Sequence, residues 1–302
     1  MNSLCKSLSS MQAGAIRQVA LGIGSFLLAT GAGANTSNGI NLPVGVTEFS
    51  REIYDLHMEV FWICVGIAVV VFGAMIFSLV KFRRSQGAVA DTQMVHSTKV
   101  EIIWTIIPVI ILVVMAIPAA EAILKIEDTR NSELSIRVTG YQWKWQYQYM
   151  DAGEGIEFFS TLAESSNFAR QLKSGIDPNT VRNYLLEVDH PLVVPSGTKV
   201  RLLLTSQDVI HAWWVPDFGA KRTAIPGFVN ELWFKVIPGK EGIYRGQCVA
   251  LCGRDHGFMP VVVDVRTPEE FKKWLGEQKA ALKQAAAPTA EPPKSAQLLP
   301  GT

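Results

Sequence analysis

Two long apolar runs without a charged residue dominate the first half of the chain. They cover residues 60–80 and residues 102–120. Each run is long enough to cross the ~30 Å hydrocarbon core of a bilayer as a helix. Pro108 and Pro118 lie in the second run, and proline is tolerated in membrane helices. The pattern predicts a transmembrane helical hairpin over residues 58–124.

The loop between the two runs carries Lys81, Arg83, Arg84 and Lys99. Because loops rich in lysine and arginine stay on the cytoplasmic side of a membrane, both ends of the hairpin are expected on the outer side. This predicts a periplasmic N-terminal segment over residues 35–57 and a periplasmic domain after the hairpin.

Residues 1–34 have the pattern of a secretory signal peptide. Lys6 and Arg17 precede or open an apolar run of small residues, and residues 32–34 (AGA) match the usual cleavage pattern. The alternative is a third membrane helix that is retained. Because the run is short and rich in glycine, the sequence favours cleavage before Asn35.

After residue 128 the pattern changes to short alternating stretches that are typical of β-strands. The candidate strands are LSIRVTG, YLLEVD, TKVRLLLTS, NELWFKVI and FMPVVVDV, separated by Pro-Gly and Pro-Ser-Gly turn signals. Many short strands imply a sandwich or barrel, which we expect to occupy residues 125–284. An amphipathic helix is predicted over residues 268–282, and the Pro- and Ala-rich residues 285–302 are predicted to be disordered.

The composition agrees with a membrane-anchored protein. Apolar residues make up 48% of the chain and the mean hydropathy is +0.20. The formal net charge of +1 provides no general attraction to nucleic acid, so no nucleic-acid partner is expected.

One short stretch, GQCVALCGRDHGFMP, concentrates the candidate chemistry. It contains Cys248, Cys252, His256 and Met259, and glycines around them favour a loop between two strands. Cysteine and methionine together indicate copper rather than structural zinc. A single blue-copper centre needs one cysteine, so the second cysteine suggests two thiolates that bridge two copper ions. Each copper ion then needs an imidazole, and one of them would come from His256.

The second imidazole has two candidates in the predicted β-domain, His190 and His211. His57 and His96 lie at the ends of the membrane runs. The residues alone leave this choice open.

Several motifs together resemble subunit II of the haem–copper cytochrome c oxidases. They are VEIIWTIIP (100–108), GYQWKWQYQY (140–149), DVIHAWWVP, AIPG (224–227) and the cysteine-rich loop, all in the order of that family. The resemblance implies a cupredoxin-like Greek-key β-barrel after the hairpin. It also implies that Cys248 and Cys252 bridge two copper ions, the dinuclear CuA centre, with one copper bound by His211 and the other by His256. Met259 and the backbone carbonyl of Ala250 would be weak ligands.

Position 250 departs from the family, where a glutamate commonly helps to hold magnesium or manganese at the interface with subunit I. Ala250 has no carboxylate. The magnesium or manganese site is therefore not carried over to this chain.

The resemblance also assigns roles to residues outside the copper loop. Trp143 would pass electrons from cytochrome c to the copper centre, while Asp189 and Asp208 are candidates for docking the cytochrome. The alternative for both acids is ordinary surface charge, and Gln148 replaces an acid that the family often has. Glu101 would form the cytoplasmic mouth of a proton channel into subunit I, or else be an interfacial charge outside the hydrocarbon.

Further residues of the aromatic run, Trp145, Tyr147 and Tyr149, stand at alternate positions. This spacing predicts a strand whose aromatic side chains point into the core.

The implied function is that of an oxidase subunit in a bacterial inner membrane, multi-pass, with both termini and the copper domain in the periplasm. It would accept electrons from cytochrome c and pass them to haem in subunit I, where oxygen is reduced to water and protons are pumped. Other oxidase subunits and membrane lipid are further partners. The alternatives are a membrane-bound copper metallochaperone or the CuA subunit of another respiratory reductase. A quinol-oxidase subunit II would share the fold but lack the copper ligands.

Overall fold

The computed structural model describes residues 41–87, 89, 93, 96–151 and 155–286. Two apolar helices form the hairpin, α2 (Glu48–Lys81) and α3 (Thr98–Ile126), and a short 3-10 turn, η2 (Arg84–Gln86), follows α2. The predicted signal peptide lies outside the described residues, as does residue 287 onward of the predicted tail.

Helix α2 begins well before the apolar run that predicted it. The Thr47 side chain accepts a hydrogen bond from the Ser50 backbone N–H, and the Ser50 side chain accepts one from the Thr47 N–H. This capping box starts the helix at Glu48 because it satisfies backbone donors of the first turn. A helix of 34 residues is about 50 Å long, so part of α2 extends beyond the ~30 Å hydrocarbon core.

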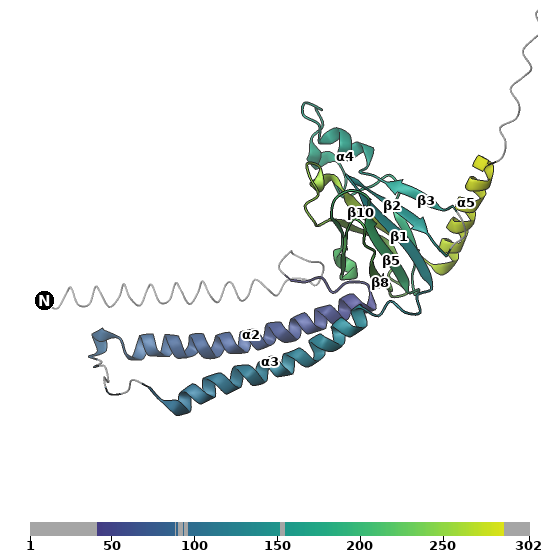
Figure 1. Cartoon of the computed structure of the whole chain (residues 1–302). Helices are drawn as coiled ribbons and strands as arrows, with labels where there is room; N and C mark the ends of the chain where they lie inside the picture. The colour runs from purple at the N-terminus through teal and green to yellow at the C-terminus, as the bar shows by residue number, and fades with distance from the viewer. Residues whose placement is uncertain (1–40, 88, 90–92, 94–95, 152–154, 287–302) are drawn as a thin grey trace, which may run out of the picture. The chain divides into compact units, whose positions relative to one another are not determined.

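The domain after the hairpin consists of two five-stranded sheets (Figure 1). The first has the order β3 (Glu157–Ser160), β2 (Lys144–Tyr149), β1 (Leu134–Tyr141), β5 (Val200–Ser206) and β8 (Asn230–Phe234). The second has the order β4 (Leu192–Pro195), β10 (Pro260–Arg266), β9 (Gly242–Cys248), β6 (His211–Val215) and β7 (Ala220–Ala224). The predicted membrane-anchored, cupredoxin-like all-β fold is confirmed.

The alternating sequence pattern is what places the core between the sheets. In β5 every second residue is buried, and in β2 the buried positions are Trp145, Tyr147 and Tyr149, as their spacing predicted. Strand β1 pairs in parallel with β5 and antiparallel with β2. One core therefore extends from the β1–β2 hairpin to Cys248 at the end of β9 and to Cys252.

The predicted strand YLLEVD is wrong. Residues 161–191, the β3–β4 connection, contain the short helix α4 (Glu164–Ala169), the 3-10 turn η3 (Pro178–Thr180) and turns, with Val188 alone bridging to Leu162. Leu185 has a φ of 63°, and its N–H donates to the Ser166 side chain at 3.1 Å. This left-handed residue and the side-chain bond divert the backbone from a strand.

The C-terminal helix α5 (Pro268–Ala286) starts where the sequence predicted it. The Glu270 N–H donates to the Thr267 hydroxyl at 3.3 Å, and the Glu270 carboxylate accepts from the Thr267 N–H at 3.1 Å. Trp274 on this helix packs against Tyr149 with ring centroids 5.2 Å apart. The helix therefore covers one end of the β-domain core.

Candidate metal centre

The ends of two paired strands and one loop bring the predicted ligands together. His211 opens β6 and Cys248 closes β9, and these strands pair so that Trp213 lies opposite Cys248. Cys252 lies in the following loop, and His256 opens the 3-10 turn η5 (His256–Phe258) before β10. The predicted placement of the cluster in a loop between two strands is confirmed.

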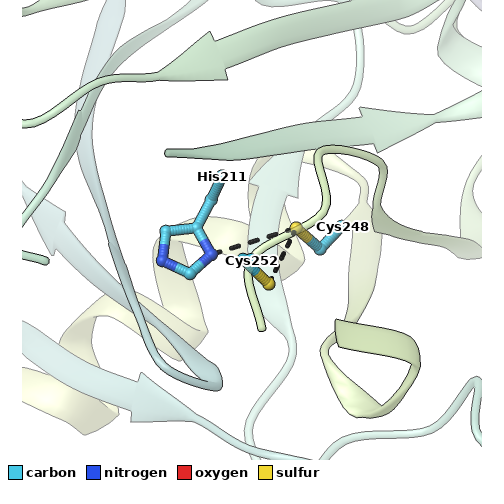
Figure 2. Close-up of side chains that lie close together, drawn as sticks. All are labelled: His211, Cys248 and Cys252. Atoms are coloured by element: carbon cyan, nitrogen blue, oxygen red, sulfur yellow. Dashed lines mark hydrogen bonds between the residues drawn. The ribbon is translucent and has the colours of Figure 1, made fainter. Parts of the chain in front are cut away.

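The thiols and imidazoles form a chain of short contacts, of which Figure 2 shows the part from His211 through Cys248 to Cys252. His211 Nδ1 lies 3.9 Å from Cys248 Sγ, which lies 3.8 Å from Cys252 Sγ. Cys252 Sγ in turn lies 3.4 Å from His256 Nδ1. The ligand atoms of His211, Cys248 and Cys252 are within 4.8 Å of one another and all three residues are buried. His190 is not among these grouped residues, and its Nδ1 lies 3.3 Å from Asp189 Oδ2.

These spacings fit atoms that share a metal ion. Two sulfur ligands at about 2.3 Å from one ion in tetrahedral geometry lie ~3.8 Å apart, and a sulfur and a nitrogen ligand lie ~3.5 Å apart. The two thiols are free, since 3.8 Å far exceeds the ~2.05 Å of a disulfide bond. The donor set of two thiolates and two imidazoles suits copper. The residues present therefore fit the dinuclear copper centre that the sequence analysis predicted.

His211 is held by contacts on three sides. Its Nε2–H donates to Asp208 Oδ1 at 2.8 Å, which directs Nδ1 toward Cys248. The Trp145 ring meets the imidazole edge-on at 5.9 Å. A Cβ at Gly140 would lie 2.8 Å from the imidazole Cδ2, so only glycine leaves room for the ring there. The imidazole is 0% exposed.

Without a metal ion, the side chains of His211, Cys248 and Cys252 shift one another's pKa values. Burial tends to lower the pKa of His211, but hydrogen bonds to Cys248 and Asp208 outweigh burial and raise it. Burial tends to raise the pKa of Cys248, but hydrogen bonds from His211 and the Ala212 backbone outweigh it and lower that pKa. The pKa of Cys252 is raised, by burial and by the neighbouring charge of Cys248. A metal ion must displace the protons on both thiols and on His211 Nδ1. Metal binding therefore strengthens as pH rises.

Trp143 connects the first sheet to residues 249–259, the loop between β9 and β10, which is called the copper loop below. It lies in the turn between β1 and β2, is half-buried, and donates its indole N–H to the Cys252 carbonyl at 3.2 Å. The Gln142 amide donates to the same carbonyl at 2.9 Å. Cys252, a candidate ligand, thus accepts a hydrogen bond through its carbonyl from Trp143, the residue that the family resemblance assigns to electron entry.

Family models match two parts of the chain. The model for the transmembrane domain of cytochrome C oxidase subunit II matches residues 35–121, and that for its periplasmic domain matches residues 134–266. A probable cytochrome c oxidase subunit 2 of Rickettsia bellii (strain RML369-C) is 38% identical over 228 residues, 76% of this chain and 80% of that protein. The chain belongs to the cytochrome c oxidase subunit II family.

The chain is also similar to other proteins. Cytochrome c oxidase subunit 2 of Arabidopsis thaliana is 34% identical over 233 residues, 77% of this chain and 86% of that protein. The periplasmic domain of subunit II of cytochrome oxidase of Bradyrhizobium japonicum, known from a crystal structure, is 39% identical and covers 51% of this chain and 98% of that chain, with a TM-score of 0.43. As a subunit II family member, the chain is membrane-anchored and part of an oxidoreductase complex.

Two further members of the predicted subunit II ligand set lie beside the cysteines. Met259 is 1% exposed, and its carbonyl accepts the Cys248 N–H at 3.0 Å. The Ala250 carbonyl oxygen lies 3.4 Å from Cys248 Sγ. Both remain predictions as weak ligands.

The remaining predicted residues lie apart from the cluster or beside it. Asp208 borders it through His211, whereas Asp189 accepts from the Thr161 N–H at 2.7 Å in the β3–β4 connection. Glu101 lies in the first turn of α3, with a carboxylate oxygen 3.7 Å from His96 Nδ1. The docking and proton-channel roles of these residues stay predictions.

Sequence analysis missed the side chains that hold the His256 side of the loop. Arg170 Nη1 of the β3–β4 connection lies 3.6 Å from Asp255 Oδ1, and its guanidinium lies 4.4 Å from the Phe258 ring centroid. These residues are adjacent to His256 in the loop but far from Arg170 in sequence. No local pattern marks such a pairing, although an aspartate next to a candidate ligand was a reason to look for a cation.

Proposed function

We propose that this chain is the electron-entry subunit of a cytochrome c oxidase. It accepts electrons from cytochrome c at a dinuclear copper centre and passes them to haem in subunit I, where oxygen is reduced to water with proton pumping. The observation that carries this proposal is the chain of contacts from the buried His211, Cys248 and Cys252 to the partly buried His256.

The proposed ligands divide the work between them. Cys248 and Cys252 would hold the two copper ions between them, His211 and His256 would each bind one, and Met259 and the Ala250 carbonyl would be weak ligands. When bound, the copper pair supplies a one-electron redox couple. The protein holds the ligands in a dry, packed setting, since His211 and both thiols are almost fully buried. A preorganised setting of this kind keeps structural change small when an electron arrives.

Electron entry is assigned to Trp143. Its indole N–H donates a hydrogen bond to the Cys252 carbonyl, so hydrogen-bonded and covalent contacts connect the ring to the Cys252 side chain, which would hold copper. The half-buried ring reaches the surface of the domain while its nitrogen contacts the copper loop. Asp208 accepts hydrogen bonds from the Gln142 N–H, next to Trp143, and from His211, and so fixes the His211 ring.

The remaining assignments place the chain in its complex. We assign it to a bacterial inner membrane with α2 and α3 both spanning it and the copper domain in the periplasm. Glu101 is assigned to proton entry on the cytoplasmic side, close to Lys99 and the basic loop. No magnesium or manganese role is assigned to Ala250, because an alanine side chain offers no oxygen ligand.

The function is tested by reducing the copper-loaded full chain in detergent with ferrocytochrome c. Wild type should be reduced within the stopped-flow time range. Trp143→Phe, which keeps an aromatic ring but loses the bond to Cys252, should slow reduction by about tenfold or more while the copper spectrum and cytochrome affinity stay nearly unchanged. Tyr141→Phe, in the same hairpin, is the matched control. An unchanged rate in Trp143→Phe would place electron entry elsewhere.

A further inference from the structure

A cavity of about 290 Å³ is lined by residues from the edges of both sheets. Strand β3 is an edge of the first sheet and β4 is an edge of the second. Trp274, Gln278 and Leu282 of α5 line the cavity from a third side, and none of the candidate copper ligands lines it. Its volume is near the lower end of the ~300–1,000 Å³ of small-molecule pockets, so a small ligand can fit.

Two aromatic rings, those of Phe158 and Trp274, form part of the cavity wall. Both rings pack against Tyr149, with ring centroids 6.3 Å and 5.2 Å away. Ile156 and Val193 also line the cavity, and each is 2% exposed. The wall is therefore apolar and is held by the packed core of the domain, so it does not have to form when a ligand binds.

Glu157 supplies an unpaired negative charge at this cavity. It is exposed on β3, and among the residues that the structure describes no hydrogen bond or ion pair engages its carboxylate. Arg266 also lines the cavity, but its Nε and Nη2 lie 2.8 Å and 2.7 Å from Asp264 Oδ2. Since the Arg266–Asp264 pair has no net charge, it does not balance the charge of Glu157.

The other charged groups around the cavity do not reverse this sign. His190 lines the cavity, and its Nδ1 lies 3.3 Å from Asp189 Oδ2. Asp189 keeps its negative charge while it accepts hydrogen bonds, so a protonated His190 would only cancel that charge. The neighbouring hollow, on the other side of α5's tryptophan, adds two acids and one base, which are Glu270, Glu277 and Lys273. Carboxylates therefore outnumber cations around the cavity.

This combination of groups suits a positively charged organic molecule. The face of an aromatic ring carries partial negative charge and attracts a cation. Contact between the apolar part of such a ligand and the rings of Phe158 and Trp274 is favourable because it removes apolar surface from water. A ligand with a carboxylate would instead be repelled by Glu157.

We propose that the cavity binds a small organic cation, an alkyl- or arylammonium ion. Its apolar body contacts Phe158 and Trp274, and its ammonium group pairs with the Glu157 carboxylate. Binding at this site does not require copper at His211 and the cysteines, because the two sites share no residue.

The test compares three ligands of similar size by isothermal titration calorimetry on the full chain in detergent, at low ionic strength and neutral pH. They are 2-phenylethylammonium, 2-phenylethanol and 3-phenylpropanoate, which are cationic, neutral and anionic, and titrations into protein-free micelles are subtracted. The cation should bind with a dissociation constant on the order of 1 mM, as befits so small a ligand. Because an ion pair with an exposed carboxylate contributes little, it should bind only about three- to fivefold more tightly than the alcohol. The anion should bind more weakly than the alcohol.

Two variants test the charge and the place of binding. Glu157→Gln should remove the advantage of the cation over the alcohol and leave the affinity for the alcohol unchanged, which also shows that the variant keeps its fold. Glu164→Gln removes a charge from an exposed glutamate in the first turn of α4 and should have no effect. Gln278→Trp places a large ring in the cavity and should abolish binding of both ligands, while the urea midpoint of unfolding stays near that of wild type.

Equal binding of the cation and the alcohol by wild type would contradict the pairing with Glu157, and so would a preference for the cation that survives Glu157→Gln. Binding that persists in Gln278→Trp would place the ligand outside this cavity. Absence of detectable binding of the cation by wild type would also overturn the proposal.

Discussion

The two histidines of the candidate copper centre are held in different ways. His211 begins a strand, is fully buried, and has fixed contacts to Asp208 and Trp145 with Gly140 against its ring. His256 lies in a 3-10 turn and is only partly buried. Its position depends on the copper loop, which Arg170 holds from outside through Asp255 and Phe258.

This difference divides the site into a rigid half around His211 and an adjustable half around His256. The sheet fixes His211 before any metal arrives, so that half is set by the folding of the domain. The His256 half is completed by an ion pair and a ring contact from the β3–β4 connection, each of which is worth about 1 kcal/mol or less near the surface. We therefore expect the His256 half to be the first to loosen when the site is disturbed.

Removing a thiol should have the largest effect, because both halves depend on the sulfur pair. Cys252 contacts Cys248 at 3.8 Å and His256 at 3.4 Å. Cys252→Ser should abolish binding of the second copper and lower total copper affinity by more than about 100-fold, since a hydroxyl is a poor ligand for this metal. Metal analysis after dialysis measures this, with His190→Ala as the control that should keep the full copper content. Retention of both coppers by Cys252→Ser would contradict the assignment.

Asp208→Asn should break the rigid half with the next largest effect. An amide oxygen can still accept the His211 Nε2–H, but it no longer carries the charge that orients the ring. Loss of such an outer partner typically lowers metal affinity by about 10–100-fold. Competition with a copper chelator gives the affinity, and Asp217→Asn provides a matched control at a partly buried aspartate outside the cluster. An affinity equal to wild type would show that Asp208 does not position His211.

Arg170→Ala should affect only the adjustable half. Losing the contacts to Asp255 and Phe258 is expected to cost about 1 kcal/mol, which corresponds to roughly fivefold faster copper loss. Arg182→Ala, at an exposed arginine of the same connection, is the control. Arg170→Lys, which keeps the charge without the planar group over Phe258, should restore part of the difference. Equal loss rates in Arg170→Ala and wild type would mean that the loop holds His256 without help.

The smallest effect should appear at low pH and involve Asp189, whose carboxylate accepts hydrogen bonds from Thr161 at the start of the β3–β4 connection. Burial tends to raise the pKa of Asp189, but bonds from Thr161 and His190 outweigh it and hold that pKa below its ordinary value of 3.8. A lowered folded-state pKa means that the stabilisation is present above pH 3.8 and is lost as pH falls through the folded value. Because the carboxylate is 38% exposed, the contribution is expected to be below about 1 kcal/mol.

Urea unfolding of the metal-free chain at several pH values measures this contribution. Asp189→Asn should be less stable than wild type near neutral pH, and the two curves should converge below the ordinary aspartate pKa. A difference that persists unchanged in strong acid would show that ionisation of Asp189 plays no part.

Sequence patterns predicted the elements whose signal is local. The uncharged runs identified α2 and α3, and alternation identified β2 and β5 with their buried residues. The start of α2 was missed because a capping box, not apolarity, sets it. YLLEVD alternates well enough to suggest a strand, but the φ of Leu185 and its bond to Ser166 are properties of the packed connection.

The same division applies to the site. Cys248, Cys252, His256 and Met259 fall within one loop, so their chemistry could be recognised from spacing. The choice of His211 over His190 required the family resemblance, because strand pairing between β6 and β9 is what brings His211 to the thiols. The pairing of Arg170 with Asp255 joins distant segments and has no local signal.

The most direct test of the account combines copper analysis with electron paramagnetic resonance on the full chain in detergent. We expect two coppers per chain and a mixed-valence signal in which one unpaired electron is shared between both nuclei. Cys248→Ser should remove this signal, because the shared electron requires both bridging thiolates. One copper per chain, with a signal localised on a single nucleus and unchanged in Cys252→Ser, would contradict the dinuclear site.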